Sequence, residues 1–241
     1  MRRLAWLLAA ALIVASCGGD DAASDEPEAL TVFAAASLTE VFQELAPDVT
    51  FNFAGSDELA TQIREGASAD VYAAAGPRYP EELAAQGFLE APQIFATNRL
   101  VVAVPADNPA GIESVDDLAA DGVRVVIGAE GVPVGDYTRS VLETMGAEEV
   151  LDNVVSNEED VKGVVGKVVS GDADAGFVYI TDATAAGDDL SAIELPAQPL
   201  IEYPIGIVTA TESYEAAQDF VELVLGEDGR QALKDAGFGL P

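Results

Sequence analysis

Short apolar runs alternate with amphipathic stretches along most of the chain. The runs are brief and continuous, which is typical of buried strands, whereas the stretches between them carry apolar residues at helical spacing. This pattern predicts strands at 30–33, 49–53, 70–74, 100–104, 124–127, 175–179 and 205–209. It predicts helices at 38–45, 57–65, 79–86, 115–120, 135–144, 158–169, 214–225 and 227–235. Because strands and helices alternate, we expect an α/β fold with mainly parallel sheets.

Two long β-rich runs bordered by proline stand out, "NRLVVAVPADNP" at 98–109 and "EYPIGIVT" at 202–209. We interpret them as two hinge strands that join two α/β lobes. The expected first lobe comprises residues 30–101 and 206–241, and the expected second lobe comprises residues 102–205. A ligand cleft between the lobes, at the ends of parallel strands, is the usual binding site of open α/β sheets.

The first residues have the pattern of an export signal. Two arginines precede an apolar run that ends at Cys17 and is shorter than the ~20 residues needed to span a bilayer. The end of the run, "VASC", resembles a bacterial lipobox, in which cleavage leaves the cysteine as the lipidated first residue. We therefore predict a lipoprotein signal peptide at 1–16, lipidation at Cys17 and a flexible tether at 17–29. The protein would then be extracytoplasmic, lipid-anchored to the outer face of the cytoplasmic membrane. The alternative is a plain signal peptide with an incidental cysteine.

The charge balance and the missing residue types exclude several functions. With 11 Lys+Arg against 43 Asp+Glu, the formal net charge is −32, which disfavours nucleic acid as a partner. The acids are scattered through helices and turns, which indicates an acidic, soluble surface better than a cationic substrate. The chain has no histidine and one cysteine, which removes Ser-His and Cys-His nucleophile pairs and nearly all zinc sites. None of the lysines, Lys162, Lys167 and Lys234, lies in a Ser-x-x-Lys pattern, so we expect no enzyme.

Four strand-to-helix junctions share one chemistry: "AAASLTE" (34–40), "FAGSDELATQI" (53–63), "GVPVGDYTRSVL" (131–142) and "SNEEDVKGVVGKV" (156–168). A helix start leaves backbone N–H groups without intrahelical partners and carries the positive end of the helix dipole. Small residues let an anion approach these groups, and a serine adds a hydroxyl donor. Ordinary N-caps are the alternative, and Ser37 with Glu40 has the spacing of a capping box.

These junctions, together with "TVFAAASLTEVF", "ADVYAAA" and "EEDVKGVVGKVVSGDADAGFVYITDA", resemble the periplasmic molybdate-binding proteins of ABC transporters. The resemblance runs from about residue 30 to the C-terminal "GFGLP". It implies two α/β lobes and an oxyanion held by neutral donors: Ser37 and Ser56 through hydroxyl and amide, Val134 and Val161 through their amides, and Tyr179 through its phenol.

The resemblance also implies the ligand and the partners. The ligand is molybdate or tungstate, with no cofactor and with metal bound only as the oxyanion. The partners are an ABC permease and its ATPase, and we expect a monomer. Two positions depart from the family pattern, because Val134 stands where alanine is usual and Gly55 replaces a frequent serine.

Three other functions remain open. A receptor for sulfate or another solute can share the fold, and a ligand-sensing domain of a transcription regulator can also share it. The signal and the lack of a basic segment disfavour the regulator. A serine hydrolase that uses Ser37 or Ser56 would need a base that the composition does not offer.

Overall fold

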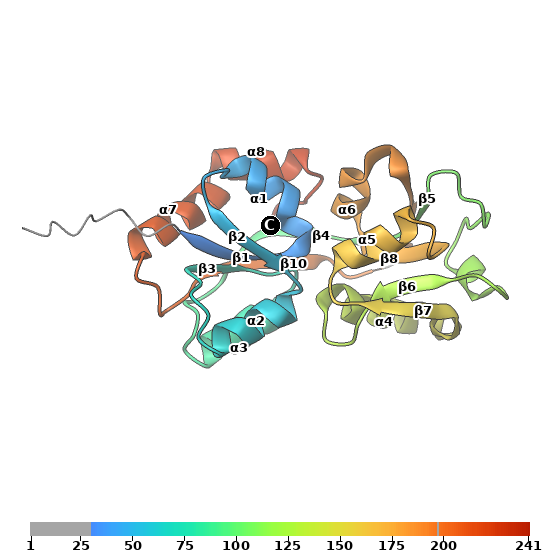
Figure 1. The fold of residues 1–241 in the computed structure, drawn as a ribbon, viewed down its shortest axis with the longest axis horizontal. Helices are drawn as coiled ribbons and strands as arrows, with labels where there is room; N and C mark the ends of the chain where they lie inside the picture. Colours follow the sequence, from blue (N-terminus) through green and yellow to red (C-terminus); the bar gives the residue numbers. More distant parts are fainter. Residues whose placement is uncertain (1–29, 197) are drawn as a thin grey trace, which may run out of the picture.

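The computed structural model describes residues 30–196 and 198–241. The predicted signal peptide, the tether and Cys17 lie outside the described residues. The chain forms two lobes, each built on one five-stranded sheet with helices on both faces (Figure 1). In the first lobe α1, α7 and α8 cover one face and α2 and α3 the other, whereas in the second lobe α5 and α6 lie opposite α4.

The elements of the first lobe come from both ends of the described chain. They are β1 (Thr31–Ala35), η1 (Ala36–Leu38), α1 (Thr39–Leu45), β2 (Thr50–Ala54), α2 (Ser56–Arg64), β3 (Val71–Ala73), α3 (Arg78–Ala85), β4 (Gln93–Asn98), β10 (Ile201–Ile207), α7 (Tyr214–Leu225) and α8 (Glu227–Asp235), where η marks a 3₁₀ helix.

The second lobe is one uninterrupted stretch. It consists of β5 (Leu100–Pro105), η2 (Asp116–Ala119), β6 (Val125–Gly128), α4 (Pro133–Met145), η3 (Glu148–Asn153), β7 (Val154–Glu158), α5 (Val161–Val169), β8 (Ala175–Tyr179), α6 (Ile180–Ala185), η4 (Gly187–Asp189) and β9 (Leu190–Glu194).

The two sheets have the same plan, with strand orders β2-β1-β3-β10-β4 and β7-β6-β8-β5-β9. The first three strands of each order pair in parallel, and the last two pairings are antiparallel. The expected two-lobed α/β fold is confirmed, and its sheets are mixed, with antiparallel pairings at β5 and β10 where mainly parallel ones were expected. The physical reason is that β5 and β10 enter their sheets directly from the other lobe, without the crossover helix that a parallel neighbour requires.

The chain passes between the lobes at Arg99 and returns between β9 and β10. The first expected hinge segment contains its crossing, but the second begins after it. Because β10 lies wholly in the first sheet, residues 201–205 belong with the first lobe and residues 100–101 with the second, the reverse of the expected division.

Most of the expected elements are present, and the differences have local causes. The pattern missed β4, β7, β9 and α6, and residues 116–119 form only a 3₁₀ turn. The expected helix at 158–169 starts later, at Val161, because the side chain of Asp160 caps that helix by accepting the Gly163 N–H at 2.9 Å. The residues before Asp160 pair with β6 as strand β7 instead.

Burial explains why the central strands have continuous apolar sequences. The residues Leu100–Val104 of β5 are at most 1% exposed, and all of β8 is buried. Helices cover both faces of such strands, so alternation with polar residues is not needed. No helix within residues 30–196 and 198–241 has the length and apolar character needed to cross a membrane.

Candidate functional site

The carboxyl ends of the parallel strands of both sheets face each other across a small cavity of about 20 Å³. It is lined by Ala35, Ala36, Ser37, Ala54, Gly55, Ser56, Ala75, Val132, Pro133, Val134, Asp160, Val161 and Tyr179. All five of the predicted site residues are in this lining. A single water needs ~10–15 Å³ by the same measure, so the cavity suits a small inorganic ion better than an organic solute.

Ser56 is the first residue of α2 and follows the N-cap Gly55. Its hydroxyl oxygen accepts the Ala75 N–H at 3.1 Å, and its carbonyl oxygen accepts the Tyr72 hydroxyl at 2.6 Å. The side chain is buried, and its oxygen already accepts one bond from the protein. The hydroxyl proton is therefore left to donate into the cavity.

Ser37 does not cap a helix, so the capping-box interpretation was wrong. Ser37 lies in the 3₁₀ turn η1, and the N-cap of α1 is Leu38, whose side chain makes no capping hydrogen bond. The Ser37 Oγ atom lies 3.0 Å from the Tyr203 Oη atom. Tyr203 belongs to β10, far along the chain, and that long-range contact occupies the hydroxyl in place of a local cap.

Val134 and Val161 line the cavity at two helix starts, where their backbone N–H groups are candidate donors. Val134 is the second residue of α4, after Pro133 at the first helical position. Gly135 makes the approach of this helix to β6 possible, because a Cβ atom there would lie 2.2 Å from the Ala129 carbonyl oxygen. Val161 is the first residue of α5, immediately after the cap Asp160. Both N–H groups belong to the first turn, which has no intrahelical acceptors.

Tyr179 ends β8 and is 1% exposed. Its hydroxyl has no hydrogen-bond partner among the described residues, although it belongs to the cavity lining. Burial raises the pKa of this phenol well above its ordinary value, so it remains a neutral donor. A buried polar atom without a partner is destabilising by ~1–3 kcal/mol, so this hydroxyl, whose ring centroid lies 5.8 Å from that of Tyr203, is a candidate donor to a ligand.

The groups that can donate hydrogen bonds into the cavity are uncharged. Of the described residues that line it, only Asp160 is ionisable apart from Tyr179, and the Asp160 carboxylate accepts the Gly163 N–H. The positive potential comes from helix starts and hydroxyl dipoles rather than from lysine or arginine. Asp57 and Asp136, which also lie in first turns, fall outside the lining.

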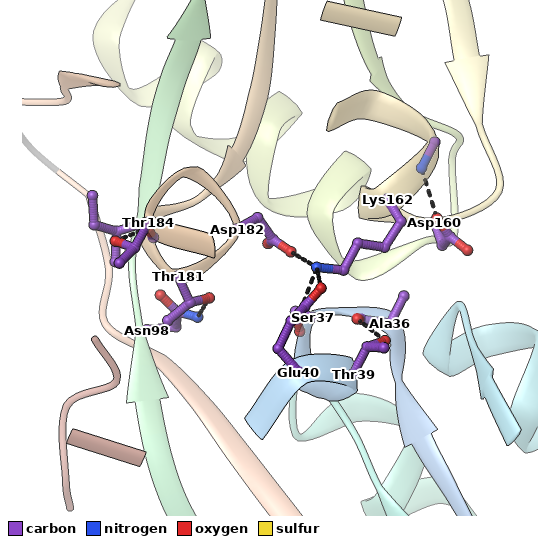
Figure 2. Close-up of polar contacts among 12 residues, drawn as sticks. Ala36, Ser37, Thr39, Glu40, Asn98, Asp160, Lys162, Thr181, Asp182 and Thr184 are labelled. Carbon is purple, nitrogen blue, oxygen red and sulfur yellow. Dashed lines mark hydrogen bonds and ion pairs between the residues drawn. The ribbon is translucent and has the colours of Figure 1, made fainter. Parts of the chain in front are cut away.

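A three-residue ion cluster joins the lobes beside the cavity (Figure 2). The Nζ atom of Lys162 on α5 lies 2.7 and 2.9 Å from the carboxylate oxygens of Glu40 on α1, and 3.2 Å from Asp182 Oδ1 on α6. Lys162 follows Val161 directly. The pairing of Lys162 with Glu40 therefore links the approach of the two lobes to the position of the Val161 N–H group.

A second set of contacts joins the lobes on the other side. The Tyr79 hydroxyl donates to the Gly131 carbonyl oxygen at 2.6 Å, and Arg78 pairs with Asp136 at 3.2 Å. Tyr79 and Arg78 belong to α3 of the first lobe, whereas Gly131 and Asp136 belong to the second. The lobes are thus closed on both sides of the cavity.

The buried carboxyl group of Asp182 makes stability depend on pH. Burial raises its pKa from 3.8 to about 6; Lys162 opposes this shift and Glu40 adds to it. The folded protein therefore holds more protons than the unfolded chain between about pH 4 and pH 6, and the contribution of this group to the free energy of unfolding falls as pH rises through that window. As pH rises from 4 to 7, we therefore expect the free energy of unfolding of Asp182→Asn to increase by about 2–3 kcal/mol relative to that of the unchanged protein.

Urea unfolding at steps of pH measures this difference. The exposed Asp188→Asn on the following turn is the matched control for the loss of one carboxylate from the surface. A difference for Asp182→Asn that does not change with pH would show that its carboxyl group titrates normally.

Sequence reasoning missed Tyr203, Asn98, Lys162 and Asp182. Tyr203 and Asn98 had no local signal, because their partners lie far away in the chain. Lys162 gave a weak signal as one of few lysines in a very acidic chain. Asp182 lies inside "GFVYITDA", but nothing in that segment shows that its carboxylate is buried.

Comparison with known proteins places these features in a family. Residues 30–239 match the family model of bacterial extracellular solute-binding proteins. The molybdate-binding protein ModA of Mycobacterium tuberculosis is 36% identical over an alignment of 255 positions that covers 97% of this chain and 97% of the relative.

Solved structures give the same picture. The periplasmic molybdate-binding protein of Azotobacter vinelandii is similar with a TM-score of 0.79 and 25% identity, over 88% of this chain and 99% of that chain. The sulfate-binding protein SubI of Mycobacterium tuberculosis is similar with a TM-score of 0.76 over 87% of this chain and 86% of that chain. At 17% identity, the likeness to SubI shows the fold alone.

Proposed function

The chain belongs to the bacterial extracellular solute-binding proteins, and on this premise we propose that Ser37, Ser56, Val134, Val161 and Tyr179 hold a tetrahedral oxyanion, molybdate or tungstate, in the closed cleft. Similarity to the molybdate-binding proteins over nearly the whole chain supports molybdate, so the protein is a molybdate-binding receptor of an ABC transporter. The observation that carries the site is the convergence of these five neutral donors on one cavity, with the Tyr179 hydroxyl lacking an acceptor within residues 30–196 and 198–241.

The donor set favours a fully ionised anion of the right size. Each hydrogen bond to a charged group contributes roughly 1.5–3 kcal/mol, so several in a closed cleft give tight binding. Phosphate carries a proton near neutral pH and would need an acceptor among these groups. Sulfate is ionised but smaller, so the fit of the closed cavity must exclude it, whereas tungstate is nearly isosteric with molybdate.

The net charge of −32 does not prevent the binding of a dianion. Charges beyond the Debye length of ~8 Å at physiological ionic strength are largely screened. The Glu40–Lys162–Asp182 cluster includes the residue that follows Val161, and Lys162 offsets part of its negative charge. The helix starts around the cavity then supply the local positive potential.

The function follows from lobe closure about the two crossings. The receptor is extracytoplasmic, and its role in an ABC importer implies a permease and an ATPase as partners that receive the loaded form. We propose in addition that Cys17 carries the lipid anchor and that the protein acts as a monomer. Its family is one of transport receptors rather than enzymes.

Thermal unfolding of the soluble form, residues 29–241, tests the ligand. Molybdate, tungstate, sulfate and phosphate are added separately at equal concentration. A ligand present at 100 times its Kd should add ~2.7 kcal/mol of stability, and we expect Tm to rise with molybdate and tungstate only. A rise with sulfate would favour the alternative, a sulfate or other solute receptor on the same fold. No rise with any of the four ions would overturn the proposed ligand.

A further inference from the structure

A chain of buried hydrogen bonds runs from the crossing between the lobes to Ser37. The Asn98 side-chain oxygen accepts the Arg99 N–H at 2.9 Å, and the Asn98 Nδ2 atom lies 2.9 Å from Thr181 Oγ1 and 3.4 Å from Tyr203 Oη. Tyr203 Oη in turn lies 3.0 Å from Ser37 Oγ. Apart from Arg99 the side chains are all buried. Figure 2 shows Asn98 and Thr181 facing each other.

The backbone fixes the orientation of the Asn98 amide. The Arg99 N–H can only donate, so the group that faces it must be the Asn98 oxygen. The NH₂ group of Asn98 is therefore on the opposite side, where it donates to Thr181 on α6 and faces Tyr203. Turning the amide over would place two donors against each other at Arg99.

This orientation decides which way the next two hydrogen bonds run. Because the Asn98 NH₂ group faces Tyr203 Oη, the phenol oxygen accepts there and keeps its proton for another partner. Among the hydrogen bonds of the described residues, that partner is Ser37 Oγ. Ser37 then accepts from Tyr203, and its own proton points away from Tyr203.

We propose that Asn98 and Tyr203 are positioning residues that hold the Ser37 hydroxyl as a hydrogen donor toward the bound oxyanion. This inference rests on the proposed function, because Ser37 must line the ligand cavity. The Ser56 hydroxyl is also held as a donor, but by a backbone group, because its oxygen accepts the Ala75 N–H. Two serines from two separate junctions are thus both turned into donors by groups behind them.

The consequence concerns selectivity. A serine hydroxyl that is free to rotate can donate to one anion and accept from another, so it does not reject a protonated oxyanion. A serine whose oxygen already accepts from Tyr203 has one of its two lone pairs occupied and its proton turned away from Tyr203, so it presents a donor to the cavity and has one acceptor position fewer. The Asn98–Tyr203 pair therefore makes the site discriminate against hydrogen phosphate, beyond what size or charge achieves.

Tyr203→Phe tests this by keeping the ring and removing the hydroxyl. Calorimetry gives Kd for sodium molybdate and for sodium phosphate, the latter by competition if it is weak. We expect the ratio of the phosphate Kd to the molybdate Kd to fall about tenfold or more, the size of one hydrogen bond to a charged group. A purely structural role would weaken both ions alike and leave the ratio unchanged, which would overturn the proposal.

A double-mutant cycle with Ser37→Ala makes the test specific. If Tyr203 acts through the Ser37 hydroxyl, Tyr203→Phe should not change the ratio further once that hydroxyl is gone. A change that persists in the Ser37→Ala background would contradict the proposal. Tyr72→Phe is the matched control, because it removes a buried phenol that contacts the Ser56 carbonyl rather than a serine hydroxyl. Tyr72→Phe should change the molybdate Kd and the phosphate Kd by the same factor.

The outcomes also separate this inference from the proposed function. If the unchanged protein does not bind molybdate, the proposed function fails. If it binds molybdate and rejects phosphate but the Tyr203→Phe ratio equals that of the unchanged protein, only the positioning role fails. Urea unfolding of each variant confirms that the measured protein is folded.

Discussion

Gly55→Ala is expected to weaken molybdate binding by about a hundredfold or more, with little change in the stability of the unliganded protein. A Cβ atom on Gly55 would lie 2.5 Å from the Glu159 carbonyl oxygen, which belongs to the opposite lobe. Side chains can move away from such an overlap, but this oxygen is backbone and lies next to the capped start of α5. The lobes must therefore stay apart, and the donors of the second lobe lose their reach to the anion.

Gly166→Ala is the control for this substitution. Gly166 lies inside α5, and a Cβ atom there meets no heavy atom within 4 Å. We expect unchanged binding and a gain of up to about 1 kcal/mol in stability from helix propensity. Calorimetry gives Kd, and small-angle scattering with excess molybdate reports closure. Normal affinity in Gly55→Ala would mean that tight closure is not needed for binding.

The double variant Ser37→Ala with Ser56→Ala is expected to lose molybdate binding by about a thousandfold. Each hydroxyl donates one hydrogen bond to a charged ligand, at roughly 1.5–3 kcal/mol, and each single variant should lose roughly ten- to a hundredfold. Ser56→Ala should also destabilise the protein by ~1–3 kcal/mol, because the buried Ala75 N–H then lacks its acceptor. Calorimetry on the two single variants and the double variant measures the losses.

Ser140→Ala is a matched control on the exposed surface of α4 and should bind normally. If the double variant is folded and retains full affinity, the two serines are not ligands, even where molybdate still binds. If Ser56→Ala loses affinity and Ser37→Ala does not, the Ser37 hydroxyl at the first junction has no role in binding.

The sequence predicted the parts of the site that are local. A serine or a small turn between a strand and a helix is visible within a few residues, and the resemblance to the molybdate-binding proteins then named the five expected donors, Tyr179 among them. What the local pattern could not reveal is which distant group faces each donor. The Ser37 hydroxyl shows this, because the Glu40 spacing indicated a cap whereas the real partner is Tyr203 on β10.

The same limit explains the errors in the fold. The apolar runs that form β5 and β10 were recognised, but strand direction depends on where the chain enters the sheet, and no residue records that. The missed strand β7 has the partly polar sequence "VVSNE" and is stabilised by pairing with β6. The Lys162 cluster depends on α1, α5 and α6 meeting, which only the assembled lobes provide.

The unequal construction of the two lobes constrains the order in which the protein can assemble. The second sheet is complete once residue 194 has emerged, whereas the first lacks β10, which sits between β3 and β4, until residue 207. The pairing of β10 with β3 joins residues more than a hundred positions apart, and such contacts form slowly. As the chain emerges, the lobe that begins later in the sequence therefore has all its strands first. The sheet of the earlier lobe therefore lacks the strand between β3 and β4 until the last fifth of the chain has emerged.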